Sequence, residues 1–183
     1  MELAEVVKLI EEAFLGIMRD EKCTLHQAQL ADQGMSRDIT DEEWRAARDR
    51  DPQSDWRDVP SAYLDGCDAA MSHLSPQGWR FYLPAYMRRA LELLDADFLS
   101  TTLPGFVIFH LTFPPTSKGI DWYRVERFKQ LNVEQERAVV AFLEFVVTNA
   151  GNEDPSYSKD AARALKRYWS LPLQERPRGL IAP

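Results

Sequence analysis

Residues 74 to 89 read Leu-Ser-Pro-Gln-Gly-Trp-Arg-Phe-Tyr-Leu-Pro-Ala-Tyr-Met-Arg-Arg, and this stretch decides the fold. Ser75 followed by Pro76 is the pair expected at the cap and first position of a helix. Beyond this pair, apolar and aromatic side chains recur on one face for four turns, which predicts the core helix of the domain. These side chains are Trp79, Tyr82, Leu83, Tyr86, Met87, Ala90, Leu91 and Leu94.

Pro84 lies in the middle of this predicted helix. It has no N–H to donate to the carbonyl of Arg80, and its ring crowds the preceding turn, so we expect a kink or a restart there. A bend would free a carbonyl beside polar side chains and make a ligand pocket possible. The candidate pocket residues are Arg80, Tyr82, Tyr86 and Arg88. Alternatively, the tyrosine rings belong to the core and the arginines pair with acidic residues of the N-terminal third.

The rest of the chain also favours helices. Apolar residues at three- and four-residue steps predict an amphipathic helix over 3–17. Thr24, the Thr40–Glu43 pair and the Asn132–Gln135 pair are helix-start signals. Further helical stretches are expected over 67–74 and 158–169, and a polar connector over 51–60. The fold class is therefore mostly α: a single-domain helical bundle with irregular packed connectors.

The pattern changes at Pro104-Gly105, where the apolar run Phe106 to Phe113 begins. This run could be one short buried strand, but no other segment looks like its partner. We interpret it as an extended or irregular packed segment. The helical domain is expected to span 1–170, and the proline-containing residues 171–183 to form an irregular tail.

Negative charge is concentrated at one end of the chain. The net charge is −7, and the first 60 residues hold 15 acidic and 8 basic side chains, which accounts for all of it. Such a field repels nucleic acid and anionic membranes and favours a basic protein partner. An acidic surface that only aids solubility is the alternative. The candidate partner-binding residues are Asp38, Asp41, Glu42, Glu43, Trp44, Asp49, Asp51, Asp55 and Trp56.

No motif in the sequence indicates catalysis, a cofactor or a metal site. His26, His73 and His110 have no ligand spacing, and the chain has no phosphate-binding glycine loop. Asp68, His73 and Ser75 contain the letters of a hydrolytic triad, but they lie on one local segment without a nucleophile elbow. Cys23 and Cys67 are expected to be reduced thiols.

No apolar run approaches the length that crosses a bilayer, and the acidic start lacks a signal peptide, so a cytoplasmic location is expected.

The central motif resembles that of a bacterial family of unknown function. Its members share Leu-Ser-Pro-x-x-(aromatic)-Arg-(aromatic)-Tyr-Leu-Pro-Ala-Tyr, found here over 74–86, after a Trp-x-x-(aliphatic)-Pro found over 56–60. The resemblance covers about residues 1–150. It implies a small bacterial protein, and similar proteins are suspected of accessory or protective roles beside toxins.

Three hypotheses for function follow from these observations. The first is a non-catalytic binding module, most concretely an immunity-type protein that neutralises a basic toxin domain through the acidic N-terminal third. The second is a small enzyme or ligand-binding domain with its pocket at the Pro84 kink. The third is a structural or homo-oligomeric module, and the sequence does not reveal the oligomeric state.

Overall fold

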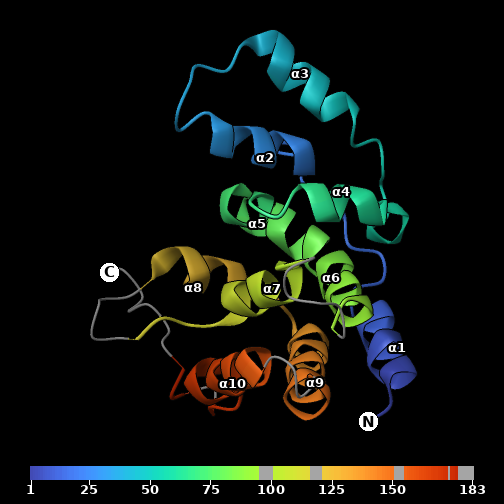
Figure 1. The fold of residues 1–183 in the computed structure, drawn as a ribbon, viewed down its shortest axis with the longest axis vertical. Helices are drawn as coiled ribbons and strands as arrows, with labels where there is room; N and C mark the ends of the chain where they lie inside the picture. Colours follow the sequence, from blue (N-terminus) through green and yellow to red (C-terminus); the bar gives the residue numbers. More distant parts are fainter. Residues whose placement is uncertain (95–100, 116–120, 151–154, 173, 177–183) are drawn as a thin grey trace.

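The helices are stacked in tiers along the long axis of the molecule (Figure 1). The computed structural model describes residues 1–94, 101–115, 121–150, 155–172 and 174–176, and these residues contain helices and no strand. A 3-10 turn, η1, spans Trp56–Asp58, and a π-helical turn, η3, spans Leu165–Trp169. The α-helices are α1 (Leu3–Ala13), α2 (Leu25–Gln33), α3 (Asp41–Asp49), α4 (Ser61–Gly66), α5 (Ala70–His73), α6 (Pro76–Glu92), α7 (Leu103–Leu111), α8 (Trp122–Phe128), α9 (Val133–Asn149) and α10 (Pro155–Ala164).

Helix α6 is the central element, as its sequence pattern predicts. Ser75 accepts a hydrogen bond from the backbone N–H of Gly78 at 3.0 Å, and Pro76 occupies the first turn. The helix packs against α1, α4, α7, α8 and η1. It does not restart at Pro84, which lies buried inside one continuous helix. Packing on several sides holds the helix together across the missing N–H, because most helical stability comes from tertiary contacts.

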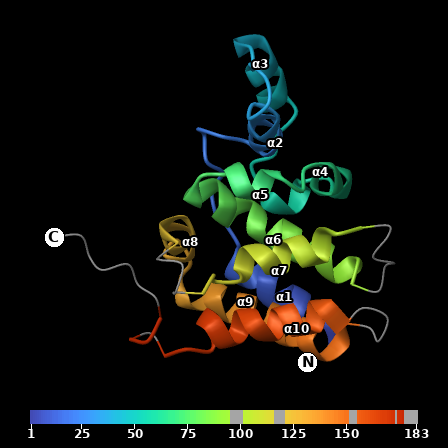
Figure 2. The same cartoon turned by 60° about the vertical axis from the view of Figure 1, so that its left-hand side comes forward.

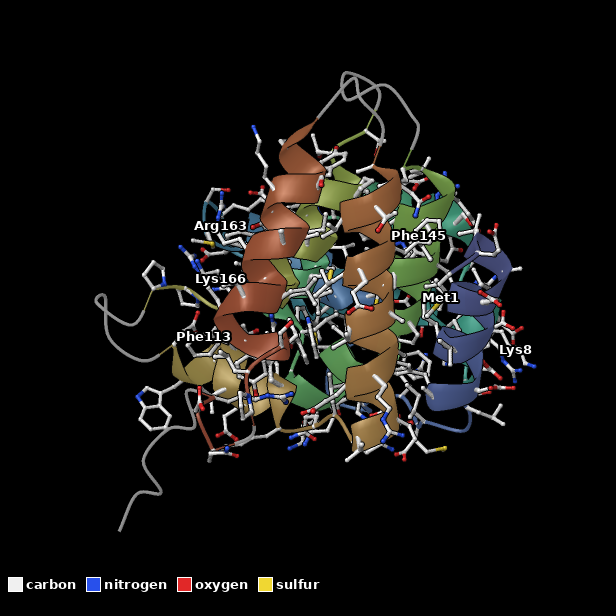
Figure 3. All side chains as sticks on the ribbon, turned by 90° about the horizontal axis from the view of Figure 1, so that it is seen from below. Met1, Lys8, Phe113, Phe145, Arg163 and Lys166 are labelled. Carbon is white, nitrogen blue, oxygen red and sulfur yellow. The ribbon has the colours of Figure 1, made fainter. Side chains whose placement is uncertain are left out.

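Below α6, the bottom tier is formed by α1, α9 and α10 (Figure 2). Helix α9 packs against both α1 and α10, and Figure 3 shows α9 and α10 side by side with Phe145 on α9. The Asn132–Gln135 capping pair opens α9 as predicted, with Gln135 N–H to Asn132 Oδ1 at 2.8 Å. Buried apolar side chains from α1 to η3 form one core cluster that runs from Val6 to Trp169 and to which α3 contributes none.

The expectation of an extended or strand-like segment over 106–113 is wrong. Residues 103–111 form helix α7, which packs against both α6 and α10. A helix buried on opposite sides is apolar around most of its circumference, so its sequence loses the helical period and looks like a buried strand. Gly105 allows the close approach of α10, because a Cβ at this position would lie 2.8 Å from the ring of Tyr157.

Helix α8 was not predicted from the sequence. It is capped by Asp121, whose side chain accepts from the Arg124 N–H at 3.1 Å.

In the predicted tail, Arg176 forms an ion pair with Glu136 at 2.7 Å, while residues 177–183 lie outside the described part of the chain. No helix among the described residues is long and apolar enough to span a membrane.

Candidate functional site

An arm formed by residues 25–51 projects from one end of the molecule. Helix α3 packs on α2, α2 packs on α5, and in both views α3 is the element farthest from the α9–α10 tier (Figures 1 and 2). The cap predicted at Thr24 and the capping box predicted at Thr40 mark where the two helices begin. We call this segment, α2 with α3 and their connections, the arm.

The arm carries four exposed carboxylates, three around the start of α3 and one at its last residue. None of them lies within ion-pair distance of a basic side chain among the described residues, whereas Glu43 pairs with Arg37 at 2.9 Å and Glu21 with Arg48 at 3.0 Å. The four are Asp38, Asp41, Glu42 and Asp49. Since no described basic side chain pairs with them, these carboxylates face solvent.

Glu43 and Trp44, also predicted to bind a partner, are half-buried on α3. The backbone N–H and side-chain hydroxyl of Thr40 bond to the Glu43 carboxylate, and together with Arg37 they lower its pKa. The backbone carbonyl of Trp44 accepts a hydrogen bond from Gln27 Nε2 of α2 at 3.0 Å. Glu43 therefore acts first as a helix cap, and Trp44 lies at the seam between the two helices.

Asp51, predicted to face a partner, lies instead in the interior at the base of the arm, with 2% of its surface exposed. Its carboxylate accepts hydrogen bonds from the His26 backbone N–H at 2.8 Å and from His26 Nδ1 at 2.7 Å. The backbone carbonyl of Asp51 accepts from Arg19. Asp51, the last residue of the arm, is therefore joined to the first turn of α2. A buried carboxylate requires such hydrogen-bond partners.

Trp56 and Asp55 also make contacts within the protein. Trp56 is 2% exposed, and its Nε1 donates to the Phe14 carbonyl at 2.9 Å, so the indole belongs to the core. Asp55 is held by a side-chain ion pair with Arg57, which lowers the pKa of the carboxyl. The sequence pattern does not separate these two residues from the exposed acids. A lone tryptophan in a polar connector has no regularly spaced apolar neighbours that would indicate its burial.

A groove of about 310 Å³ runs between the two helices of the arm. Since α2 and α3 are antiparallel, His26 and Arg50 lie at its inner end and Gln33 and Glu43 at its outer end. The lining residues are His26, Gln29, Leu30, Gln33, Glu43, Ala46, Ala47 and Arg50. The ring of His26 packs edge-on against Tyr63, with centroids 4.6 Å apart, so the imidazole orientation is fixed.

The candidate pocket residues at Pro84 do not come together as a ligand site. Tyr82 and Tyr86 are buried; Tyr82 accepts from the Leu25 N–H at 3.2 Å and Tyr86 donates to the Cys67 carbonyl. Burial raises the pKa of both phenols. Arg88 pairs with Glu11 at 3.3 Å, which confirms the ion-pair interpretation for this residue. Arg80 donates instead to the Gln135 side chain at 3.0 Å.

The three residues with the letters of a triad have separate roles. His73 Nε2 lies 3.1 Å from the Asp32 carboxylate, Ser75 caps α6, and Asp68 accepts from the Ala69 N–H at 2.8 Å.

Burial raises the pKa of the Cys23 and Cys67 thiols to about 11, and nearby carboxylates add to this, so neither is an activated nucleophile. No cluster of three His, Cys, Asp or Glu residues that could hold a metal ion occurs in the described ranges.

A buried cationic cluster, which the sequence did not reveal, joins α7 to α8. Arg127 is 1% exposed; its guanidinium donates to the Leu74 carbonyl at 2.9 Å and to the Tyr123 hydroxyl, and it stacks 3.8 Å from the Tyr123 ring centroid. His110 Nδ1 lies 3.5 Å from the guanidinium. Burial lowers the pKa of Arg127 to about 10 and that of His110 to about 3, the latter with help from Arg127 and Arg124.

The chain belongs to a family of unknown function, DUF6714, whose model matches residues 2–172. The match includes the central motif over 74–86 and the whole arm. It agrees with the resemblance to an uncharacterised family that the motif suggested. No curated protein and no solved structure matches the chain.

Proposed function

We propose that this protein is a non-catalytic binding module, an immunity-type protein that neutralises a basic toxin domain. The observation that carries the proposal is the arm: a projecting helix pair that presents Asp38, Asp41, Glu42 and Asp49 with no ion-pair partner in the described part of the chain. Exposed charge at the end of a projection can meet the cationic cleft of another protein with little steric hindrance. Trp44, half-buried on the same helix, supplies an aromatic group beside the charges, as binding hot spots commonly do.

The arm is a better docking element than the acidic third as a whole. Many other carboxylates of the first 60 residues have structural roles, such as Asp51 at the base of the arm and Glu11 paired with Arg88. Complementary charge mainly accelerates association and excludes wrong partners, which suits an inhibitor that must reach a toxin quickly. A cytoplasmic location, where a toxin made by the same cell would first appear, is part of this proposal.

The test is the association rate with a basic toxin domain encoded by a neighbouring gene and identified by co-purification after co-expression. Neutralising the arm is expected to slow association at low ionic strength by about tenfold or more, with little effect at high salt, because steering is electrostatic. The arm variant combines Asp38→Asn, Asp41→Asn, Glu42→Gln and Asp49→Asn. Stopped-flow fluorescence measures the rate constants.

A control variant removes the same number of negative charges elsewhere on the exposed surface. It combines Asp58→Asn, Asp68→Asn, Glu144→Gln and Glu175→Gln. The proposal requires the control to associate at close to the wild-type rate. Equal slowing of both variants would show that only net charge matters, and unchanged association of the arm variant would place the docking surface elsewhere.

A further inference from the structure

We infer that the groove between α2 and α3 is a receptor pocket for one basic side chain of the partner, an arginine in preference to a lysine. This inference rests on the proposed function and adds where the partner's central contact is made. The groove has room for such a side chain, since its volume is about 310 Å³. It opens on the arm, which also carries the four exposed carboxylates that would draw a cationic surface toward it.

The walls of the groove suit the aliphatic part of an arginine. Leu30 from α2 and Ala46 and Ala47 from α3 line the groove, and the two alanines lie between Glu43 and Arg50 on its α3 side. Long basic side chains bury their methylene groups along such surfaces and leave the charged end for polar contacts. The guanidinium would then lie near polar residues of α2.

The glutamine side chains along α2 include acceptor oxygens. Gln29 lines the groove, and its Oε1 is buried without a hydrogen-bond donor from any described residue. Gln33 and Glu43 add acceptor oxygens at the outer end, where Arg37 already contacts both of them. A buried acceptor without a partner is costly, and a ligand's donor would remove that cost once the Gln29 amide turns toward the groove.

His26 supplies a further acceptor at the inner end. The Asp51 carboxylate accepts from Nδ1 at 2.7 Å, so Nδ1 carries a proton, and in this tautomer Nε2 is an acceptor. No described residue is hydrogen-bonded to Nε2, and His26 lines the groove. The Asp51–His26 pair therefore places a buried negative charge behind an oriented acceptor, which favours a cation over an anion.

Arg50 is the one cation among the groove-lining residues. Its guanidinium lies over the Tyr63 ring, 5.8 Å from the centroid, at the inner end of the groove. Arg50 competes with a bound cation for the same negative field. Removing Arg50 therefore tests whether the ligand is a cation or an anion. Arg50→Gln should strengthen the binding of a cation severalfold, whereas it would weaken the binding of an anion.

The probe is Nα-acetyl-arginine amide, with the uncharged Nα-acetyl-citrulline amide as its matched analogue. Two-dimensional NMR on the full-length protein follows the imidazole of His26 and the side-chain amide of Gln29 during titration. We expect saturable shifts of both groups with the arginine probe, and at least tenfold weaker binding of the citrulline probe. Gln29→Leu should weaken binding of the arginine probe by about fivefold to tenfold, the ratio that corresponds to one lost hydrogen bond.

Ala46→Leu fills the groove and should abolish binding, whereas Ala62→Leu, at an exposed site on α4, should leave it unchanged. Equal shifts with both probes, shifts confined to residues outside the arm, or a loss of affinity in Arg50→Gln would overturn the inference. Those results would leave the proposed function intact if the arm-neutralised variant still associates slowly with the toxin domain. Slow association of Ala46→Leu with the toxin domain would support both.

Discussion

Between about pH 6.5 and pH 3, the protein is expected to lose about 1.4 kcal/mol of stability per pH unit through His110 alone. The unfolded chain binds a proton on His110 below about pH 6.5, whereas the buried imidazole of the folded chain stays neutral until about pH 3. Falling pH therefore favours the unfolded state over this range. Burial is the main cause, and the neighbouring guanidinium groups of Arg127 and Arg124 add to it.

The measurement is urea unfolding at pH 7 and pH 4 for the wild type and for His110→Gln. Carboxylates titrate in the same range, so the diagnostic quantity is the difference between the two proteins: the variant should lose about 3 kcal/mol less than the wild type. Carbon chemical shifts of the His110 ring in the wild type give an independent reading. A ring that protonates near pH 6 in the folded protein would show that the prediction is wrong.

The substitution Trp56→Ala is expected to lower the free energy of unfolding by about 3–5 kcal/mol, because it empties a large core site. The indole is buried, and its Nε1 donates to the Phe14 carbonyl at 2.9 Å, so a buried acceptor also loses its partner. By contrast, Trp44→Ala removes a half-buried side chain on the arm and should cost only about 1 kcal/mol.

Chemical denaturation of the two variants makes the comparison, with Trp56→Phe as a milder substitution if Trp56→Ala does not fold. Toxin binding provides the second readout: Trp44→Ala should weaken it, while folded Trp56→Phe should bind like the wild type. Similar losses of stability in Trp44→Ala and Trp56→Ala would contradict the division between core and arm that the structure draws.

Local signals in the sequence predict much of the fold. The helix starts at Ser75, Thr24, Thr40 and Asn132 were predictable because each cap is a short-range pattern of a side chain and a nearby backbone N–H. The apolar face of α6 was predictable from its period. The helix at 103–111 was not, because burial between α6 and α10 removes the polar positions that would reveal its period.

The candidate site was only partly predictable, for a related physical reason. The acidic character of the N-terminal third is a property of composition, but which carboxylates remain unpaired depends on tertiary contacts. Asp51 and Asp49 are two positions apart, yet one is buried against His26 and the other is exposed on the arm. The groove between α2 and α3 depends on how two helices pack, which neither helix shows alone.

Hydrogen exchange of the complex with the toxin domain, compared with the free protein, tests the role of the arm most directly. If the arm is the docking element, exchange should slow across residues 25–51, most strongly in α3, and remain unchanged in α9 and α10. Slower exchange over α9 and α10 with an unprotected arm would contradict this account and move the interface to the opposite end of the molecule.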